Sequence, residues 1–363
     1  MTMSEPLDFC RRRFSHLKKL MQDHVLDLVY LQGGGQRLKR IADTTSGTAL
    51  IVPLDGNPRL FCHSVDINST REESWVPVEE LRGRAEADRQ IADYCNLHLH
   101  KGSKVGVQSE GFSHTSYGFM KENLKGELVD ISGTLVPEVF YGLHPGEAKF
   151  QRKVSKLADI ACSVAREAMR PGVAEYEVAA EAEYAMRREG AELTSFATIV
   201  STGPRSAYSH GWPTSRRLKD GEFMLVDLGP QIDGYAADET RTFLLGSDPK
   251  KEKMLDAMDK AVEAVVQAVK PGVKCIDLDA LSRSVLKDHG FPDYPHSLGH
   301  PISGFAVPNL SKTSDHVLRE GMLFTVEPGI YLPGYGGVRM EENVLVTEDG
   351  FEQLTRSPRI PTY

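Results

Sequence analysis

Five residues in the second half of the chain carry side chains that metal ions accept as ligands. They are four carboxylates and one imidazole: Asp227, Asp238, His300, Glu327 and Glu341. Four carboxylates cannot share a dry cleft without cations, because each charge raises the pKa of the others. Carboxylates with one imidazole suit Mn²⁺, Co²⁺, Fe²⁺ or Zn²⁺, and a pair of bridged ions would activate a water molecule and stabilise a tetrahedral oxyanion.

An internal repeat of about one hundred residues predicts the elements that position these acids. Met169–Val173 and Val269–Val273 share the sequence Pro-Gly-Val, and each lies between two segments with helical periodicity. Pro-Gly is a stop signal between the two helices of each copy, and Gly190 and Gly290 end the second helix. Each copy therefore begins as a pair of helices.

The repeat continues into two strand-like segments. Gly221–Gly229 lines up with Gly321–Gly329, and Gly234-Tyr235 lines up with Gly334-Tyr335. Two helices followed by a hairpin, twice over, predict an α+β fold with an internal duplication and a pseudo-twofold axis between its halves.

The same alignment predicts that the carboxylates converge near that axis. Asp227 and Glu327 end equivalent apolar strands, and Asp238 and Glu341 lie on the return strands. Asp227 and Asp238 are eleven residues apart, an odd separation that would put them on opposite faces of one ideal strand. A hairpin turn at Asp233-Gly234 or a bulge must therefore bring them together.

Several segments around these residues resemble the signature of the pita-bread metallopeptidases, which include Xaa-Pro aminopeptidases, prolidases, methionine aminopeptidases and creatinase. The segments are Asp227–Phe243, His296–His300, Glu327–Tyr331, Gly337–Glu341 and Ile199–His210. The resemblance implies that Asp227 binds one of two divalent ions (Mn, Co, Zn or Fe), that His300 and Glu327 bind the other, and that Asp238 and Glu341 bridge both.

The resemblance also implies three catalytic residues beside the metal ligands. His210 would lie next to the substrate and contact the developing oxyanion or the leaving group. His296 would face the substrate pocket. Arg339 would orient the bridging carboxylates from behind.

Residues 1–143 have a different pattern from the duplicated part. Strand-like runs at Asp27–Leu31, Thr48–Leu54 and Ser103–Gln108 alternate with amphipathic helices, which predicts a separate, smaller α/β domain. This region resembles the N-terminal domain of creatinase and the prolidases, which methionine aminopeptidases lack. We therefore expect an N-terminal domain at 1–143 and a pita-bread catalytic domain at 144–363, in the branch that cleaves peptide bonds next to proline.

Two departures from the family pattern leave the substrate open. Val307 stands where the family's peptidases usually carry a further histidine, and Pro301 replaces the glycine after the ligand histidine. Valine can neither donate a hydrogen bond nor shuttle a proton, and losing one such donor typically costs about 10²–10³ in rate. Three hypotheses follow: an Xaa-Pro aminopeptidase or dipeptidase, a creatinase-like hydrolase of a small non-peptide amide, and a catalytically weak pita-bread binding module.

The amino-acid composition limits the classes of molecule that the protein could bind. The 363 residues include 43 Lys and Arg against 51 Asp and Glu, a formal net charge of −8 that disfavours a nucleic-acid or anionic-membrane binder. The start of the chain has no apolar core of a secretory signal. The five cysteines are scattered with no metal or redox spacing, which predicts a cytoplasmic protein. The family resemblance adds the expectation of a homodimer.

Overall fold

The computed structural model describes residues 5–83 and 86–360, which divide into two compact units. The first comprises the described residues up to 141 together with residues 304–306, and the second comprises residues 142–303 and those from 307 onward. The predicted boundary between residues 143 and 144 stays a prediction, and its outer ends at 1 and 363 lie outside the described residues.

The first unit is built on one six-stranded mixed sheet, in the order β4-β3-β2-β1-β5-β6. At its centre, β1 runs antiparallel to β2 and parallel to β5. The strands are β1 (Leu28–Gln32), β2 (Ala49–Pro53), β3 (Arg59–His63), β4 (Val78–Leu81), β5 (Lys104–Val107) and β6 (Glu127–Asp130). The three predicted strand segments correspond to β1, β2 and β5.

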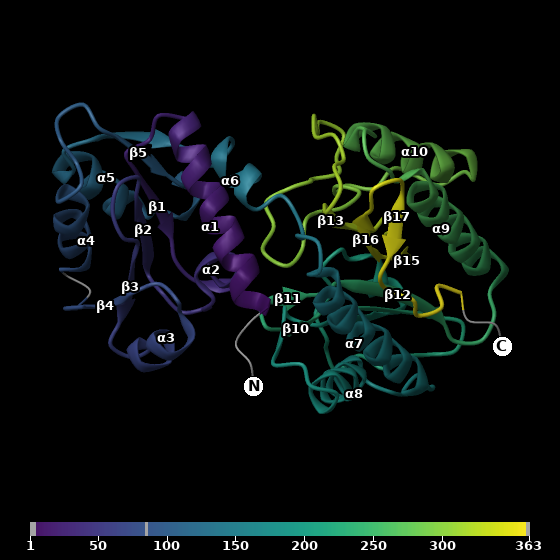
Figure 1. The fold of residues 1–363 in the computed structure, drawn as a ribbon. Helices are drawn as coiled ribbons and strands as arrows, with labels where there is room; N and C mark the ends of the chain where they lie inside the picture. The colour runs from purple at the N-terminus through teal and green to yellow at the C-terminus, as the bar shows by residue number, and fades with distance from the viewer. Residues whose placement is uncertain (1–4, 84–85, 361–363) are drawn as a thin grey trace. The chain divides into compact units, whose positions relative to one another are not determined.

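Helices cover both faces of this sheet (Figure 1). They are α1 (Glu5–Asp23), α2 (Gly35–Ala42), α3 (Ile67–Glu73), α4 (Ala87–Asn96), α5 (His114–Asn123) and α6 (Leu135–Val139), with a 3₁₀ turn η1 (Ser109–Gly111). Side chains of β1 alternate between two cores: Val29 and Leu31 pack with residues of α1 and α6, whereas Leu28 and Tyr30 pack with residues of α4 and α5.

The second unit contains the duplicated pairs of helices. They are α7 (Ala148–Glu167) with α8 (Glu175–Arg188) and α9 (Pro249–Ala268) with α10 (Cys275–Asp288) (Figure 1). The Pro-Gly turns between the helices put Gly172 and Gly272 at φ of 82° and 86°, a conformation that favours glycine. The two copies also repeat a backbone bond: Gly172 N–H donates to Leu218 O at 2.8 Å, and Gly272 N–H donates to Leu318 O at 2.9 Å. In the part of the chain described, no helix combines the length and the apolarity that crossing a bilayer requires.

Short strands complete the second unit. They are β7 (Leu193–Thr194), β8 (Ile199–Thr202), β9 (Phe223–Leu228), β10 (Pro230–Ile232), β11 (Tyr235–Ala236), β12 (Glu239–Leu244), β13 (Leu323–Val326), β14 (Gly329–Leu332), β15 (Gly336–Arg339), β16 (Glu342–Val346) and β17 (Phe351–Gln353), with a 3₁₀ turn η2 (Gly203–Ala207).

Each half contains one long hairpin, interrupted near its middle. In the first, β9 and β10 return as β11 and β12, and the turn is the predicted Asp233-Gly234, with both residues at positive φ. That is the type I′ geometry that a two-residue hairpin turn favours. In the second hairpin, β13 and β14 return as β15 and β16 around a three-residue turn, 333–335.

The one-residue difference in turn length changes the predicted alignment of the halves. Tyr235 lies in a strand and pairs with Ile232, whereas Tyr335 lies in the turn and donates its N–H to Leu332 O. The two Gly-Tyr pairs are therefore not equivalent in the hairpins, contrary to the sequence alignment. Beyond the turns, equivalent residues differ by 101 positions rather than 100.

Candidate active site

One cavity in the second unit, of about 670 Å³, is lined by all eight residues that the sequence singled out. They are Asp227, Asp238, His300, Glu327, Glu341, His210, His296 and Arg339. A volume of this size suits a small ligand. The lining residues come from both halves of the duplication.

The carboxylates lie where the two hairpins are interrupted. Asp227 is in β9 and Asp238 immediately precedes β12; Glu327 immediately follows β13 and Glu341 immediately precedes β16. Thr240 is the residue paired with Asp227, so Asp238, two residues from Thr240, lies on the same face of the hairpin as Asp227. The hairpin thus brings Asp227 and Asp238 to one face in spite of their odd separation, as the sequence predicted.

Three of these side chains form a compact group that could hold a metal ion. One ligand atom from each of Asp238, His300 and Glu341 lies within 4.8 Å of the other two. The Nε2 atom of His300 is also 3.2 Å from Glu327 Oε1 and 3.6 Å from Asp238 Oδ2. The imidazole therefore faces a cluster of carboxylate oxygens.

The orientation of the His300 ring suits a metal ligand. Its Nδ1 lies 3.2 Å from Pro301 O. Since a carbonyl oxygen can only accept, Nδ1 carries the proton, and in the neutral ring the Nε2 lone pair points at the carboxylates. The backbone N–H of His300 donates to Thr325 Oγ1 at 3.0 Å, and this hydroxyl donates to Glu327 Oε1 at 3.1 Å. Thr325 thus fixes both His300 and Glu327.

The electrostatics of the group call for positive charge. Burial, and then the charges of neighbouring carboxylates, raise the pKa of Asp238 and of Glu341 well above their ordinary values. Burial alone lowers the pKa of His300, but its hydrogen bond to Glu327 and the nearby carboxylates outweigh burial and raise it to about 9. Protons are thus drawn to the site, as they are wherever acidic groups are crowded together.

Two carboxylate oxygens of the site have no hydrogen-bond partner among the described residues. They are Asp227 Oδ1 and Glu341 Oε1, both buried. A buried acceptor without a partner is costly, and an acidic group in such a place is stabilised by a cation. The oxygen-rich donor set with one imidazole fits divalent metal ions.

Arg339 supplies the fixed positive charge beside this group. Its Nη2 lies 2.5 Å from Asp227 Oδ2, its Nε donates to Thr240 Oγ1 at 3.2 Å, and its Nη1 donates to Tyr331 Oη at 3.0 Å. The charge of Arg339 opposes the effect of burial, which raises the pKa of Asp227. Arg339 also donates to Ser209 O at 3.1 Å, one residue before His210, so it links a carboxylate to the histidine loop.

His296 belongs to the same chain of hydrogen bonds. Its Nδ1 faces Ser297 O at 2.8 Å, and its Nε2 lies 2.8 Å from Tyr331 Oη. Because the Ser297 carbonyl can only accept, Nε2 is the acceptor in the neutral ring, and the Tyr331 hydroxyl donates to it. Burial lowers the pKa of His296, partly offset by the charge of Glu327. Both ring nitrogens are therefore occupied within the protein.

His210 lies on a loop, where it is exposed and lines the cavity. Its ring stacks against Trp212 with the centroids 6.3 Å apart, and both side chains are exposed. Phe196, Ala197 and Ile199 line the cavity with Trp212. The lining of the site thus combines polar and apolar side chains.

Comparisons with known proteins identify the family. The model of metallopeptidase family M24 matches residues 149–348, and that of the creatinase/prolidase N-terminal domain matches residues 13–138. The chain belongs to metallopeptidase family M24. It therefore has the pita-bread fold that the sequence predicted, and it is a metallohydrolase of peptide bonds that uses divalent metal ions.

Individual relatives span most of this M24 peptidase. An Xaa-Pro dipeptidase of Pyrococcus furiosus is 31% identical over 96% of the chain and 99% of its own length, and one of Pyrococcus horikoshii is 35% identical over 83% and 84%. Among solved structures, an Xaa-Pro dipeptidase from Bacillus anthracis has a TM-score of 0.87 at 28% identity, covering 97% of this chain and 100% of that one.

Of the two positions that depart from the expected family pattern, Val307 is buried and Pro301 is half-buried. Val307 is 4% exposed, so an apolar side chain is well accommodated there. Asn309, two residues further on, lines the cavity and donates its backbone N–H to His316 Nδ1 at 3.1 Å. The segment after His300 thus contributes Asn309 to the lining of the cavity.

Three residues of the site were assigned no role from the sequence: Thr240, Thr325 and Tyr331. Thr240 donates to Glu341 Oε2 at 2.7 Å, and Tyr331 joins His296 to Arg339. Both stand inside segments that resemble the family signature, so proximity in the sequence was the available signal. Thr325 has the same signal, two residues before Glu327, but only its contacts reveal what it does.

Proposed function

We propose that this M24 peptidase is a dinuclear Xaa-Pro dipeptidase. Asp227, Asp238, His300, Glu327 and Glu341 would hold the two divalent ions, with Asp238 and Glu341 as the bridging ligands. The observation that carries the proposal is the convergence of these five side chains on one cavity, with buried carboxylate oxygens that lack other partners. Bound ions of this kind polarise a scissile carbonyl and lower the pKa of a bound water.

The remaining polar residues would orient the ligands and the substrate. Arg339 would hold Asp227 in place and keep it ionised, since its guanidinium lies beside that carboxylate. His210 is exposed to the cavity, which supports a contact with the oxyanion or the leaving group. His296 would form part of the wall, because both of its ring nitrogens are engaged by Ser297 and Tyr331.

The apolar walls support proline as the residue after the scissile bond. A pyrrolidine ring presents apolar surface and no N–H group, so it needs packing rather than hydrogen bonds. Phe196, Ile199 and Trp212 offer such surfaces. The names of the nearly full-length relatives point to the same substrate class, a dipeptide ending in proline.

Hydrolysis of a peptide panel after chelation tests the proposal. We expect Xaa-Pro dipeptides to be cleaved only when Mn²⁺, Co²⁺ or Zn²⁺ is added back, with two ions bound per chain at full activity. Xaa-Ala dipeptides serve as the matched control for proline, and Xaa-Pro tripeptides separate a dipeptidase from an aminopeptidase. Cleavage that is unaffected by chelation, or that saturates with one ion, would contradict the dinuclear site.

A creatinase-like activity on a small non-peptide amide is the second candidate. Val307 favours it, since that side chain cannot replace a histidine that contacts a scissile carbonyl. Adding creatine and other small amides to the same panel decides between the two. Turnover of such an amide with no cleavage of Xaa-Pro peptides would support the second candidate and exclude the first.

Metal identity, assembly and compartment complete the proposal. We propose manganese as the working metal, a homodimer as the assembly and the cytoplasm as the compartment. The five cysteines are all buried and free, which supports a reducing compartment. Metal analysis of the purified enzyme and its mass in solution test the first two.

A further inference from the structure

Behind the site, side chains of each return strand hold the backbone of the other. Asn343 on β16 is fully buried, and its side chain makes two hydrogen bonds to the backbone of Asp238. Its Oδ1 accepts from Asp238 N–H at 3.1 Å, and its Nδ2 donates to Asp238 O. The equivalent residue of the first half, Thr242 on β12, does the same for Arg339: its Oγ1 accepts from Arg339 N–H at 3.2 Å and donates to Arg339 O at 2.9 Å.

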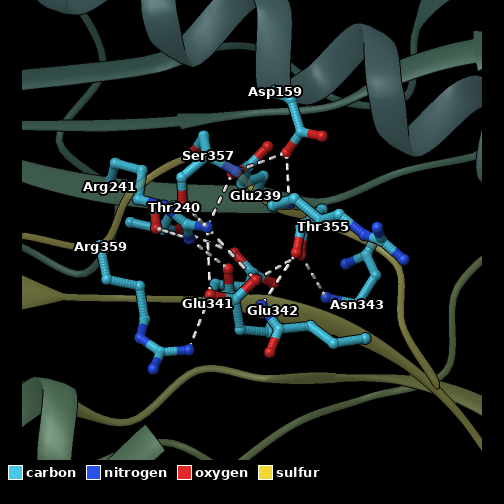
Figure 2. Close-up of polar contacts among 12 residues, drawn as sticks. Asp159, Glu239, Thr240, Arg241, Glu341, Glu342, Asn343, Thr355, Ser357 and Arg359 are labelled. Carbon is cyan, nitrogen blue, oxygen red and sulfur yellow. Dashed lines mark hydrogen bonds and ion pairs between the residues drawn. The ribbon is translucent and has the colours of Figure 1, made fainter. Parts of the chain in front are cut away.

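Arg241, fully buried on β12, holds the other bridging carboxylate (Figure 2). Its Nη1 donates to Glu341 O at 2.6 Å and to Thr240 O at 3.0 Å. The Glu341 N–H in turn donates to Thr240 O at 3.0 Å. The backbone of Glu341 is therefore fixed from both sides by residues that follow Asp238.

Two buried carboxylates surround the guanidinium of Arg241. Its Nη2 lies 2.9 Å from Glu239 Oε1 and 3.0 Å from Glu342 Oε1, and it also donates to Ser357 O at 2.9 Å. Figure 2 shows Glu239, Glu342 and Ser357 gathered around this side chain. The N–H groups of the Arg241 guanidinium thus all face acceptors, and a lysine ammonium could not make the same set of hydrogen bonds.

An ionic cluster of this kind is not explained by stability alone. Burying charges costs several kcal/mol per ion, and well-packed apolar residues of similar volume are often as stable or more so. Its geometry, in contrast, has a clear consequence. Arg241 follows Asp238 in the sequence and binds the backbone of Glu341. Asn343 follows Glu341 and binds the backbone of Asp238.

We propose that Asn343 and Arg241 are positioning residues that set the separation of Asp238 and Glu341 across the pseudo-twofold axis, and thereby the affinity and geometry of the metal pair. This inference rests on the proposed dinuclear function. Neither residue lines the cavity. They act through the backbone of the two bridging ligands.

Asn343→Ala is the first test, made on the full-length enzyme with Co²⁺. We expect the affinity for the second ion to fall about 10–100-fold, the usual cost of losing a group that orients a ligand. We also expect the visible Co²⁺ spectrum to change and kcat to fall more than KM rises. Asn96→Ala is the matched control: its amide accepts from Lys125 N–H and donates to Asn123 O in the first unit, and its loss should leave Co²⁺ affinity, spectrum and kcat unchanged.

Arg241→Lys and Arg241→Met provide the second test. The lysine keeps the charge between Glu239 and Glu342 but cannot also reach Glu341 O. We expect it to fold, as judged by circular dichroism, yet to bind Co²⁺ more weakly and with an altered spectrum, and we expect the methionine variant to be worse on both counts. If Arg241→Met does not fold, Arg241→Lys and Asn343→Ala still decide the question.

The outcomes separate this inference from the function on which it rests. Wild-type enzyme that binds two ions and cleaves Xaa-Pro dipeptides, together with Asn343→Ala and Arg241→Lys variants of wild-type affinity, spectrum and kcat, would overturn the positioning role and leave the function intact. Wild-type enzyme that binds fewer than two ions would instead overturn the function. Lower stability of the variants with unchanged Co²⁺ affinity and spectrum would show that the cluster is purely structural.

Discussion

The two hairpins of the second unit share one strand arrangement, apart from turns of different length, but carry different side chains at equivalent positions. Asp227 corresponds to Glu327, so both outgoing strands end in an acid. On the return strands, Asp238 corresponds to Arg339, and Thr240 to Glu341. The duplication thus supplies a symmetric scaffold, while the charges on it are asymmetric. One return strand gives a carboxylate where the other gives the arginine that pairs with Asp227.

The loops that carry the histidines differ in the same way. Each second helix begins by donating a backbone N–H to its loop: Glu175 to Arg216 O, and Cys275 to His316 O. The fully buried Glu175 side chain then accepts from Thr202, Arg205 and Thr214. Burial raises the pKa of the Cys275 thiol to about 12, so that residue stays neutral. Charge at the start of the helix therefore fixes the His210 loop, whereas the His300 loop is fixed by charge further along its helix. There Arg283, paired with Asp279, donates to Tyr294 O and His296 O.

Removing the two carboxylates that we propose as bridging ligands should have the largest effect. Asp238→Asn and Glu341→Gln keep the shape of each side chain but remove the charge that attracts a second ion. We expect each to lower kcat/KM for an Xaa-Pro dipeptide by more than about 10³-fold, beyond the loss of a single hydrogen-bond donor. Equal losses would mean that the two halves contribute alike. Substantial activity in both variants would contradict a dinuclear site.

Arg339→Lys tests the arginine that breaks the symmetry. Lysine keeps the charge near Asp227 but cannot also reach Tyr331, Thr240 and Ser209. We expect kcat/KM to fall about 10–100-fold, because Asp227 and the His210 loop lose their common anchor. Steady-state kinetics at saturating metal provide the measurement. A variant with wild-type kinetics would show that only the charge matters, and Arg339→Gln, which lacks the charge, would then be the inactive one.

At the start of the second helices, the charged Glu175 should matter more than the neutral Cys275. Glu175→Gln removes a fully buried carboxylate charge that pairs with the partly exposed Arg205. We expect it to lower the free energy of unfolding by about 2 kcal/mol, the scale of a hydrogen bond to a charged group. Cys275→Ala removes one buried sulfur from a neutral setting and should cost about 1 kcal/mol. Urea unfolding measures both. Only Glu175→Gln should also raise KM, since it loosens the loop before His210. The reverse order of stabilities would contradict the role of Glu175 in fixing the His210 loop.

The sequence predicted the parts of this comparison that depend on residue type and regular spacing. The Pro-Gly turns, the paired helices, the strand-ending acids and the predicted alternation of the first unit all leave periodic or punctuated signals. The five ligand candidates and three basic residues were found because they stand in recognisable segments, and the structure brings them to one cavity.

What the sequence could not indicate depends on contacts between distant segments. Asn343 gives no signal as a partner of Asp238, more than a hundred residues away, because a side-chain amide can hydrogen-bond almost any backbone. The one-residue offset between the return strands of the two hairpins also leaves no signal in the sequence, for a different reason. Gly-Tyr occurs in both halves, and nothing local shows that Tyr235 enters a strand while Tyr335 stays in the turn.

That difference in turn length can itself be tested, with the smallest expected effects. Gly234 and Gly334 both have positive φ, at 74° and 77°, where an L-residue costs about 1–2 kcal/mol. A two-residue type I′ turn requires positive φ at both positions, whereas a three-residue turn can redistribute strain over its third residue. We therefore expect Gly234→Ala to lower the unfolding free energy by about 2 kcal/mol and Gly334→Ala by about 1 kcal/mol.

The matched variants Gly234→Asn and Gly334→Asn separate backbone strain from crowding. Asparagine tolerates the left-handed region better than alanine, so it should recover most of the loss at both sites. At Gly334 an added Cβ would meet no atom within 4 Å, so the backbone alone sets the cost there. Equal losses at the two turns would mean that the shorter turn has as much freedom as the longer one. The register of the return strands would then be fixed by Asn343 and Arg241 rather than by the turns.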